Sequence, residues 1–314
     1  ALVAMFPALV AVTGMAAARE LVALTALVGM HVPGLHSMFS SLSVEFGGNG
    51  SITGSPDDLA YEVTLVDRRF SRATIAVTAS SLTGTVVAFV RPSPVEQHVD
   101  TGAVNNGEFA GHRWLIVGGS RGLGAAAVRL LTAGGAEVRF TYHRGADDAA
   151  AIHAGTGAAA ARLDVFNQAL PDSLLAALGP DWAPTHLGWF ASPPIFVGAR
   201  GTYSKPLFDR FRSAYVDAFS TAIEHLVPRG LMAALWPSSE AVDTDVPGLA
   251  EYADAKRLGE LRCRELERSY PPLHIAAPRL PRLLTDQSTS FVPVEFGDTA
   301  IEILAALRAT LRER

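Results

Sequence analysis

The chain has 314 residues, of which 49% are hydrophobic and 18% charged, with a formal net charge of -5. This length and composition suit one or two globular domains with large buried cores. The mild acidity, without any basic block, argues against nucleic acid or an anionic membrane as partners. The single cysteine, Cys263, excludes an internal disulfide framework and a cysteine-only metal site, and we expect a cytoplasmic location.

The first 34 residues are the most apolar part of the chain. Arg19 and Glu20 interrupt them, and the uncharged runs on either side are shorter than the roughly 20 residues of a bilayer span. We therefore predict a buried helix and no membrane partner. A signal peptide is the weaker alternative, because "MAAARE" mimics a cleavage site but no positive segment precedes it. Since the sequence starts at Ala1 and not at methionine, we expect that an upstream segment was removed or left out.

Residues 37 to 92 contain short runs rich in β-branched residues, separated by clusters of Gly, Ser, Asn and Asp. This pattern predicts an antiparallel sheet that follows the apolar helix. Residues 96 to 111 lose all periodicity and gather Gly and Asn, which indicates a linker. We therefore predict a first domain over residues 1 to 95 and a second over residues 112 to 314.

From Trp114 onward, apolar runs of strand length alternate with amphipathic helical stretches. Continuous apolar strands that alternate with helices are typical of a parallel sheet covered on both faces. The second domain is therefore predicted to be a doubly wound α/β fold of the Rossmann type.

The first strand of this domain, "WLIVGG", runs through a glycine-rich turn directly into a helix. Glycines in that context let the backbone approach a pyrophosphate at a helix N-terminus. A glycine-rich turn without a ligand is the alternative interpretation. The residues that we expect to bind the cofactor here are Gly118, Ser120, Arg121, Gly122, Leu123 and Gly124.

The next strand ends in "FTYHRG", at the position that normally faces the adenosine ribose. An arginine there can pair with a 2′-phosphate, so Arg144, with Arg121 as a second cation, favours NADPH over NADH. Asp164 follows the third strand and is expected to meet the adenine edge. Solvated loop arginines and a turn aspartate are the alternatives.

Tyr252 and Lys256, in "EYADAK", stand four positions apart in a predicted helix and therefore share one face. A nearby ammonium favours the phenolate, so such a tyrosine can serve as an acid or base near neutral pH. Ser239 lies 13 residues before Tyr252 (252 minus 239), at the end of an apolar strand. We predict that Ser239 holds a substrate carbonyl oxygen.

Together, "GGSRGLG", "LDV" and "YADAK" make residues 112 to 286 resemble the short-chain dehydrogenase/reductase family. The resemblance implies that Tyr252 donates a proton to a carbonyl, that Lys256 lowers its pKa and binds the nicotinamide ribose, and that Ser239 orients the substrate. It also implies that Ala191, after the fourth strand, and Thr285, after the sixth, contact the cofactor.

Four positions depart from the family pattern. Val117 replaces a threonine, "FASPPIF" replaces Asn-Ala-Gly, and Arg279 follows Pro278 where the family has glycine. The fourth catalytic residue of the family, an asparagine, corresponds to Asp217 in an ungapped placement. These departures are compatible with a divergent reductase or with a nucleotide-binding or scaffolding domain that has lost turnover.

The apolar helix with its following strands resembles a hot-dog fold of the MaoC-like hydratase and dehydratase type. The Asp and His signature of that family is absent before Thr13, so either it lies upstream of Ala1 or this half is degenerate. His31 and His36 flank a turn, and partly buried hydrogen-bonding histidines are the preferred interpretation. The resemblance leaves open that this half is the working hydratase or dehydratase.

The leading hypothesis is an NADPH-dependent ketoreductase that acts on a 3-oxoacyl thioester of coenzyme A or acyl carrier protein. That substrate follows from the hot-dog resemblance, because reduction and dehydration are consecutive steps on such thioesters. A homodimer is expected from both resemblances, and no metal ligand pattern is found.

Overall fold

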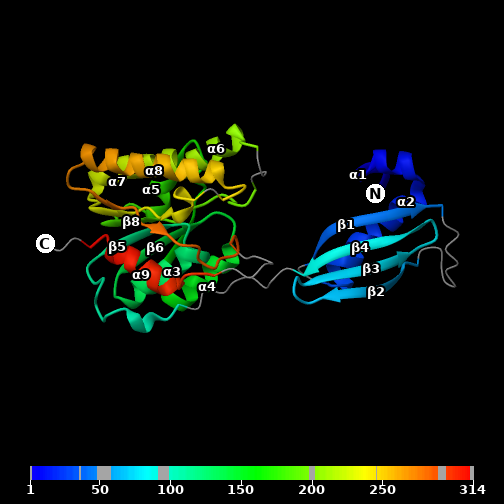
Figure 1. The fold of residues 1–314 in the computed structure, drawn as a ribbon. Helices are drawn as coiled ribbons and strands as arrows, with labels where there is room; N and C mark the ends of the chain where they lie inside the picture. The colour runs from blue at the N-terminus through cyan, green and yellow to red at the C-terminus, as the bar shows by residue number, and fades with distance from the viewer. Residues whose placement is uncertain are drawn as a thin grey trace. The chain divides into compact units, whose positions relative to one another are not determined.

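The computed structural model describes residues 2–34, 37–47, 58–90, 99–197, 202–244, 246–288 and 295–311. The chain divides into two compact units, the first up to residue 94 and the second from residue 95 on (Figure 1). Each unit has its own hydrophobic core.

The first unit is a helix packed on an antiparallel sheet. Its strands follow the order β1-β4-β3-β2. Its helical segments are α1 (Leu2–Met5), α2 (Pro7–Ala26) and the π-helical turn η1 (Leu27–His31), and its strands are β1 (Ser37–Phe46), β2 (Ala60–Asp67), β3 (Arg72–Thr78) and β4 (Leu82–Val90). The hot-dog assignment of this region stays a prediction.

The helix is held on the sheet by an apolar stripe and by one buried carboxylate. Alternate residues of the central strands, such as Ile75 and Val86, pack against Leu24 of α2. The carboxylate of Glu20, which is 8% exposed, accepts hydrogen bonds from the Ser80 hydroxyl (2.5 Å) and from the hydroxyl (2.6 Å) and N–H (3.1 Å) of Ser81. These bonds satisfy a charge that would otherwise be costly to bury.

Most of the surface of this helix is exposed, so the prediction of a buried helix is wrong except for one face. The segment Pro7–His31 has a mean hydropathy of 1.5 over its most apolar 18 residues, and only 17% of that stretch is buried. Val12, for example, is 85% exposed. By length and composition it could cross a membrane, but a core helix or a signal sequence passes the same test. His31 ends η1 in an exposed position, and His36 lies outside the described residues.

The second unit confirms the predicted doubly wound α/β fold. Its main sheet has six parallel strands in the order β11-β9-β8-β5-β6-β7. The strands are β5 (Arg113–Val117), β6 (Glu137–Tyr142), β7 (Ala159–Arg162), β8 (His186–Trp189), β9 (Ala233–Leu235) and β11 (His274–Ala276). A short parallel pair, β10 (Ser238–Ser239) and β12 (Arg279–Leu280), extends beyond β9 and β11.

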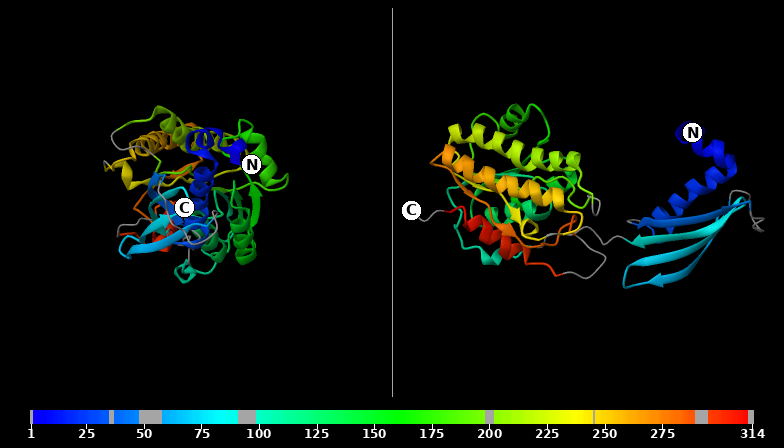
Figure 2. Two further views of the ribbon diagram at one scale, coloured as in Figure 1. Left: turned by 90° about the vertical axis from the view of Figure 1, so that its right-hand side faces the viewer. Right: turned by 45° about the horizontal axis from the view of Figure 1, so that its top comes forward.

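Helices cover both faces of this sheet (Figures 1 and 2). One face packs against α3 (Gly122–Ala133), α4 (Ala146–Thr156) and α9 (Thr299–Arg308). The other packs against α5 (Leu170–Leu178), α6 (Lys205–Arg212), the π-helical turn η3 (Ser213–Asp217), α7 (Ala218–Leu226) and α8 (Ala250–Ser269). The 3-10 turns η2 (Thr101–Ala103), η4 (Val227–Arg229) and η5 (Glu240–Val242) lie in the connections.

The strand order reverses between β5 and β8, which are neighbours in the sheet. In open parallel sheets, ligands bind beyond the carboxyl ends of the strands at such a reversal. The glycine-rich loop follows β5, and Ala191 and Ser192 follow β8. The fold therefore brings these two segments together at the position where a ligand is expected.

Candidate functional site

The glycine-rich loop is built for close approach of backbone to backbone. Gly118 has a φ of +87°, and a Cβ there would lie 2.6 Å from the Ala191 nitrogen. A Cβ on Gly124 would lie 2.1 Å from the Gly118 carbonyl oxygen. Only glycine fits these two positions, so the loop turns tightly and presents the N-terminus of α3, where N–H groups lack helical partners.

The structure brings several predicted cofactor residues around this loop. Gly122 faces Thr285, since a Cβ on Gly122 would lie 3.6 Å from the Thr285 methyl group. A Cβ on Gly145 would lie 3.3 Å from the Ser120 hydroxyl and 3.5 Å from the Arg121 Nε, so both side chains lie beside the loop after β6. These residues border one region at the carboxyl ends of β5 and β6.

The predicted 2′-phosphate residues lie at that same end of β6. Arg144 is exposed and precedes Gly145, while Arg121 pairs with Asp148 at 3.3 Å and with Asp286 at 3.9 Å. Asp164 follows β7, where its carboxylate lies 3.6 Å from His143 and accepts the Phe166 N–H. Arg121 therefore lies beside the residue that follows Arg144, and two aspartates already pair with it.

Tyr252 and Ser239 meet beyond the carboxyl end of β9. Tyr252 lies in the first turn of α8 and is 8% exposed, and Ser239 ends the short strand β10. Burial raises the pKa of the Tyr252 phenol, and a hydrogen bond with the Ser239 side chain opposes that rise. The Ser239 oxygen also accepts the Ala241 N–H at 3.2 Å, which leaves its own proton free to donate.

Lys256 lies one turn further along α8 and is also buried. Its ammonium donates to the Pro237 carbonyl at 2.7 Å, and its Nζ lies 4.0 Å from the Tyr215 ring centroid and 4.4 Å from that of Trp236. The Tyr252 ring centroid is 5.8 Å from the same Nζ. Burial lowers the pKa of Lys256 from 10.5 to about 7. The lysine is therefore near its titration point at neutral pH.

Sequence reasoning missed Tyr215, which lies in η3. Its hydroxyl is 2.6 Å from that of Ser192, and its ring meets the Tyr252 ring edge to face at a centroid distance of 5.9 Å. Burial raises the pKa of Tyr215 well above its ordinary value. An aromatic residue near the middle of an amphipathic helix is usually read as core, and no local motif distinguishes Tyr215 from such a residue.

The structure does not bring Asp217 together with Ser239, Tyr252 and Lys256, so its catalytic assignment stays a prediction. Its side chain is 52% exposed and pairs with Arg212 at 3.4 Å, away from the buried cluster. Residues 213 to 217 form a π-helical turn, which adds a residue and rotates the side chains that follow. Tyr215, within the same turn, is buried and faces Lys256.

Arg279, which replaces a glycine of the family pattern, is held by two acidic side chains. Its guanidinium bonds both carboxylate oxygens of Glu260, at 2.8 and 2.7 Å, and Asp243 at 2.6 Å. Glu260 in turn accepts the Ser238 hydroxyl at 2.6 Å, and its pairing with Arg279 lowers its pKa. The network therefore connects β12 to α8 beside the Ser239 and Tyr252 pair.

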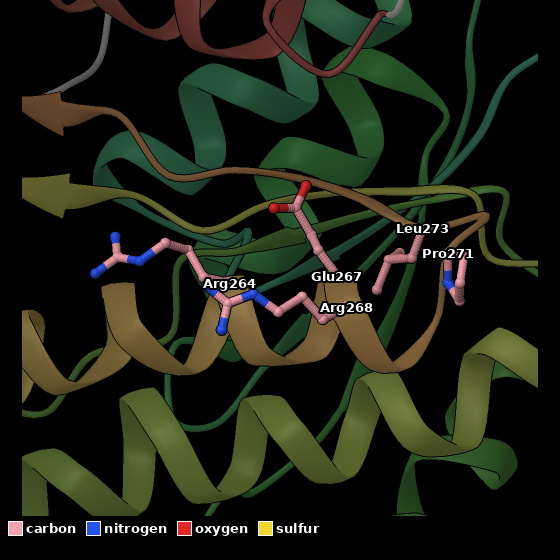
Figure 3. Close-up of a pocket in the computed structure, with 5 residues that line it drawn as sticks. All are labelled: Arg264, Glu267, Arg268, Pro271 and Leu273. Carbon is pink, nitrogen blue, oxygen red and sulfur yellow. The ribbon is translucent and has the colours of Figure 1, made fainter.

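A surface cavity of about 370 Å³ lies elsewhere, at the end of α8 (Figure 3). Arg264, Glu267, Arg268, Pro271 and Leu273 line it. Leu273 immediately precedes β11, so the cavity lies by the amino ends of the parallel strands. It is therefore separate from the site at their carboxyl ends.

No protein-family model matches the chain. A curated protein of Escherichia coli strain K12, the cyclic-di-GMP-binding biofilm dispersal mediator protein, is 30% identical over 168 residues. The match spans 53% of this chain and 70% of that protein.

Solved structures share the fold. BdcA in complex with NADPH is 26% identical with a TM-score of 0.55, and the match covers 64% of this chain and 88% of BdcA. A short-chain dehydrogenase/reductase from Serratia marcescens is 20% identical (TM-score 0.56, 64% and 91% covered). A 3-oxoacyl-[acyl-carrier protein] reductase from Brucella melitensis with bound NAD is 18% identical (TM-score 0.56, 69% and 90% covered). With its glycine-rich loop and its six-stranded parallel sheet, the second unit has the fold of the short-chain dehydrogenase/reductase structures.

Proposed function

We propose that the second unit is an NADPH-dependent reductase that converts a ketone to a secondary alcohol. The observation that carries this proposal is the convergence of Ser239, Tyr252 and Lys256 at the carboxyl end of the sheet that also bears the glycine-rich loop. The structure of BdcA, a relative in fold and sequence, contains NADPH, which supports the same cofactor here.

The residues of the loop fit a dinucleotide. Gly118 and Gly124 leave no room for side chains between the loop and its neighbours, which brings backbone N–H groups within reach of phosphate oxygens. Arg144 and Arg121 supply positive charge where a 2′-phosphate would lie. When bound, NADPH supplies the hydride.

The chain itself supplies the proton and the orientation of the substrate. Tyr252 holds its proton at neutral pH, since a phenol ordinarily titrates near pH 10 and burial raises its pKa further, so it can donate that proton to a carbonyl oxygen. The Ser239 hydroxyl donates a hydrogen bond to the same oxygen. Lys256 in its protonated form stabilises the phenolate that remains after proton transfer.

The substrate class in this proposal is a 3-oxoacyl thioester of coenzyme A or an acyl carrier protein. It is supported by the hot-dog resemblance of the first unit and by fold-level likeness to a 3-oxoacyl-[acyl-carrier protein] reductase. A cytoplasmic location and homodimerisation are part of the same proposal. Light scattering that gives a monomer mass at working concentrations would contradict homodimerisation.

The proposal is tested by measuring NADPH oxidation with a short 3-oxoacyl thioester in the wild-type protein and in Tyr252→Phe. Loss of the proton donor should reduce kcat/KM by a factor of at least about 100. NADPH binding, followed by its fluorescence, should persist in the variant because Tyr252 is outside the glycine-rich loop. Tyr270→Phe, at the far end of α8, is the matched control and should retain the wild-type rate. Full activity of Tyr252→Phe would remove the proposed role.

A second candidate is a nucleotide-binding unit without turnover. It is favoured by the exposure of Asp217, by the departures at Val117 and Arg279, and by the relative whose name describes cyclic-di-GMP binding. Calorimetric titration with NADPH and with cyclic di-GMP tests it. Binding of either nucleotide, without NADPH oxidation across a panel of carbonyl compounds, would favour this candidate over the reductase.

The hydratase or dehydratase alternative places the chemistry in the first unit. The one buried carboxylate of its described helix, Glu20, already accepts hydrogen bonds from Ser80 and Ser81. Hydration of a short enoyl thioester that survives the change Tyr252→Phe would support this alternative.

A further inference from the structure

Tyr215 touches three parts of the site at once. Its ring lies under the Lys256 ammonium at 4.0 Å and against the Tyr252 ring, edge to face, at 5.9 Å. Its hydroxyl bonds that of Ser192, which immediately follows the predicted cofactor contact Ala191 in the segment after β8.

The geometry gives this residue two separable functions. An aromatic face close to an ammonium stabilises the charged form, and the effect grows when the pair is withdrawn from water. Tyr215 is 2% exposed and Lys256 7% exposed, so this pair is withdrawn from water. The bond to Ser192 fixes the rotation of the ring, and the Tyr215 carbonyl accepts the Trp236 indole N–H at 2.8 Å, which fixes its backbone.

We propose that Tyr215 is a positioning residue for the Tyr252 and Lys256 pair, with its ring holding the lysine and its hydroxyl anchoring that ring on Ser192. The effect of Tyr215 on catalysis rests on the proposed function. The contact of ring with ammonium, however, can be measured without turnover. Tyr215 acts through Lys256 and is not itself assigned a proton-transfer step.

The surroundings of Lys256 define what a titration would report. The ionisable groups that face it are Tyr252, Glu260 and Cys263 on α8 and Tyr215 on η3. The Glu260 carboxylate is held by Arg279, and burial raises the pKa of Cys263 to about 12. Glu260 therefore remains charged and Cys263 neutral near pH 7, which leaves Lys256 as the group of this set that titrates there.

The chain contains two lysines, Lys205 and Lys256, so protein labelled with ¹³C-lysine gives two side-chain signals. Lys205 is 78% exposed and serves as an internal reference, and Lys205→Met identifies its signal. The pKa of Lys256 is read directly from the pH dependence of the other signal.

Tyr215→Leu should lower the pKa of Lys256 by about one unit, because the ammonium loses the ring that stabilises it. Phe211→Leu removes the ring that stacks on Tyr215 and is the control, with an unchanged Lys256 signal expected. An unchanged pKa in Tyr215→Leu would overturn the inference. If Tyr215→Leu does not fold, the proposal remains open to refutation through the anchoring role of the hydroxyl, which the conservative variant described next tests.

Tyr215→Phe keeps the ring and loses the bond to Ser192. We expect it to leave the Lys256 pKa within a few tenths of the wild-type value and to lower kcat for NADPH oxidation more than it changes KM. Ser192→Ala should reproduce that effect, and the double variant should be no slower than either single variant. Additive losses would overturn the anchoring role of the hydroxyl pair. If the wild-type protein oxidises no NADPH while Tyr215→Leu shifts the Lys256 signal, the reductase proposal fails and the contact of Tyr215 with Lys256 stands.

Discussion

Replacement of Lys256 by methionine should stabilise the second unit at neutral pH and lose that advantage at alkaline pH. Methionine has a similar length and no charge, so it can occupy the space between the Tyr215 and Trp236 rings. The folded protein lowers the pKa of Lys256 from 10.5 to about 7. Between these values the unfolded chain holds a proton that the folded chain releases.

The magnitude follows from this difference. At about 1.4 kcal/mol per pKa unit, keeping Lys256 buried costs up to about 5 kcal/mol below pH 7 and nothing above pH 10.5. The cost is still about 4 kcal/mol at pH 7 and falls to about 2 kcal/mol at pH 9. Methionine leaves the Pro237 carbonyl without its donor, which offsets roughly 2 kcal/mol of the gain at every pH. The variant should therefore be more stable by about 2 kcal/mol at pH 7 and nearly equal to wild type at pH 9.

Urea unfolding followed by tryptophan fluorescence reports on the relevant unit, because all four tryptophans of the chain lie after residue 113. The free energy of unfolding is compared between wild type and Lys256→Met at several pH values from 7 to 9. Lys205→Met, which changes an exposed lysine paired with Asp209, is the control and should differ from wild type by a constant amount. A constant difference for Lys256→Met as well would mean that Lys256 titrates at its ordinary pKa, and the reasoning would be refuted.

Two further predictions concern the cofactor and the first unit. Arg144→Ala should weaken NADPH binding by roughly 10-fold or more and leave NADH binding unchanged, because a charge-assisted bond to phosphate is worth about 1.5 to 3 kcal/mol. Fluorescence titration with both nucleotides measures this, and equal losses for the two would contradict a role in reading the 2′-phosphate. Glu20→Ala should destabilise the first unit by about 2 kcal/mol, because the Ser81 N–H and two hydroxyls lose their acceptor. Hydrogen exchange in α2 and β4, with the exposed Glu45→Ala as control, should show faster opening in Glu20→Ala alone.

The sequence alone determined the parts of the site that depend on neighbouring residues. The glycine-rich loop between β5 and α3 was predictable because strand, turn and helix follow one another directly in the chain. The alternation of apolar runs with helices predicted the parallel sheet, which the structure confirms. The pairing of Tyr252 with Lys256 on one face followed from helical spacing, since four residues complete about one turn.

Tertiary packing decided the features that depend on contacts between distant segments. In the π-helical turn at residues 213 to 217, Asp217 lies at the surface and Tyr215 lies against Lys256. The position of the Arg279 guanidinium depended on its bonds to Glu260 and Asp243, neither of which is near it in the sequence. The exposure of α2 depended on how little of its surface the four strands of the first unit cover. Burial and charge pairing are properties of the three-dimensional arrangement, so the titration of Lys256 follows from its packed neighbours and not from its spacing in the chain.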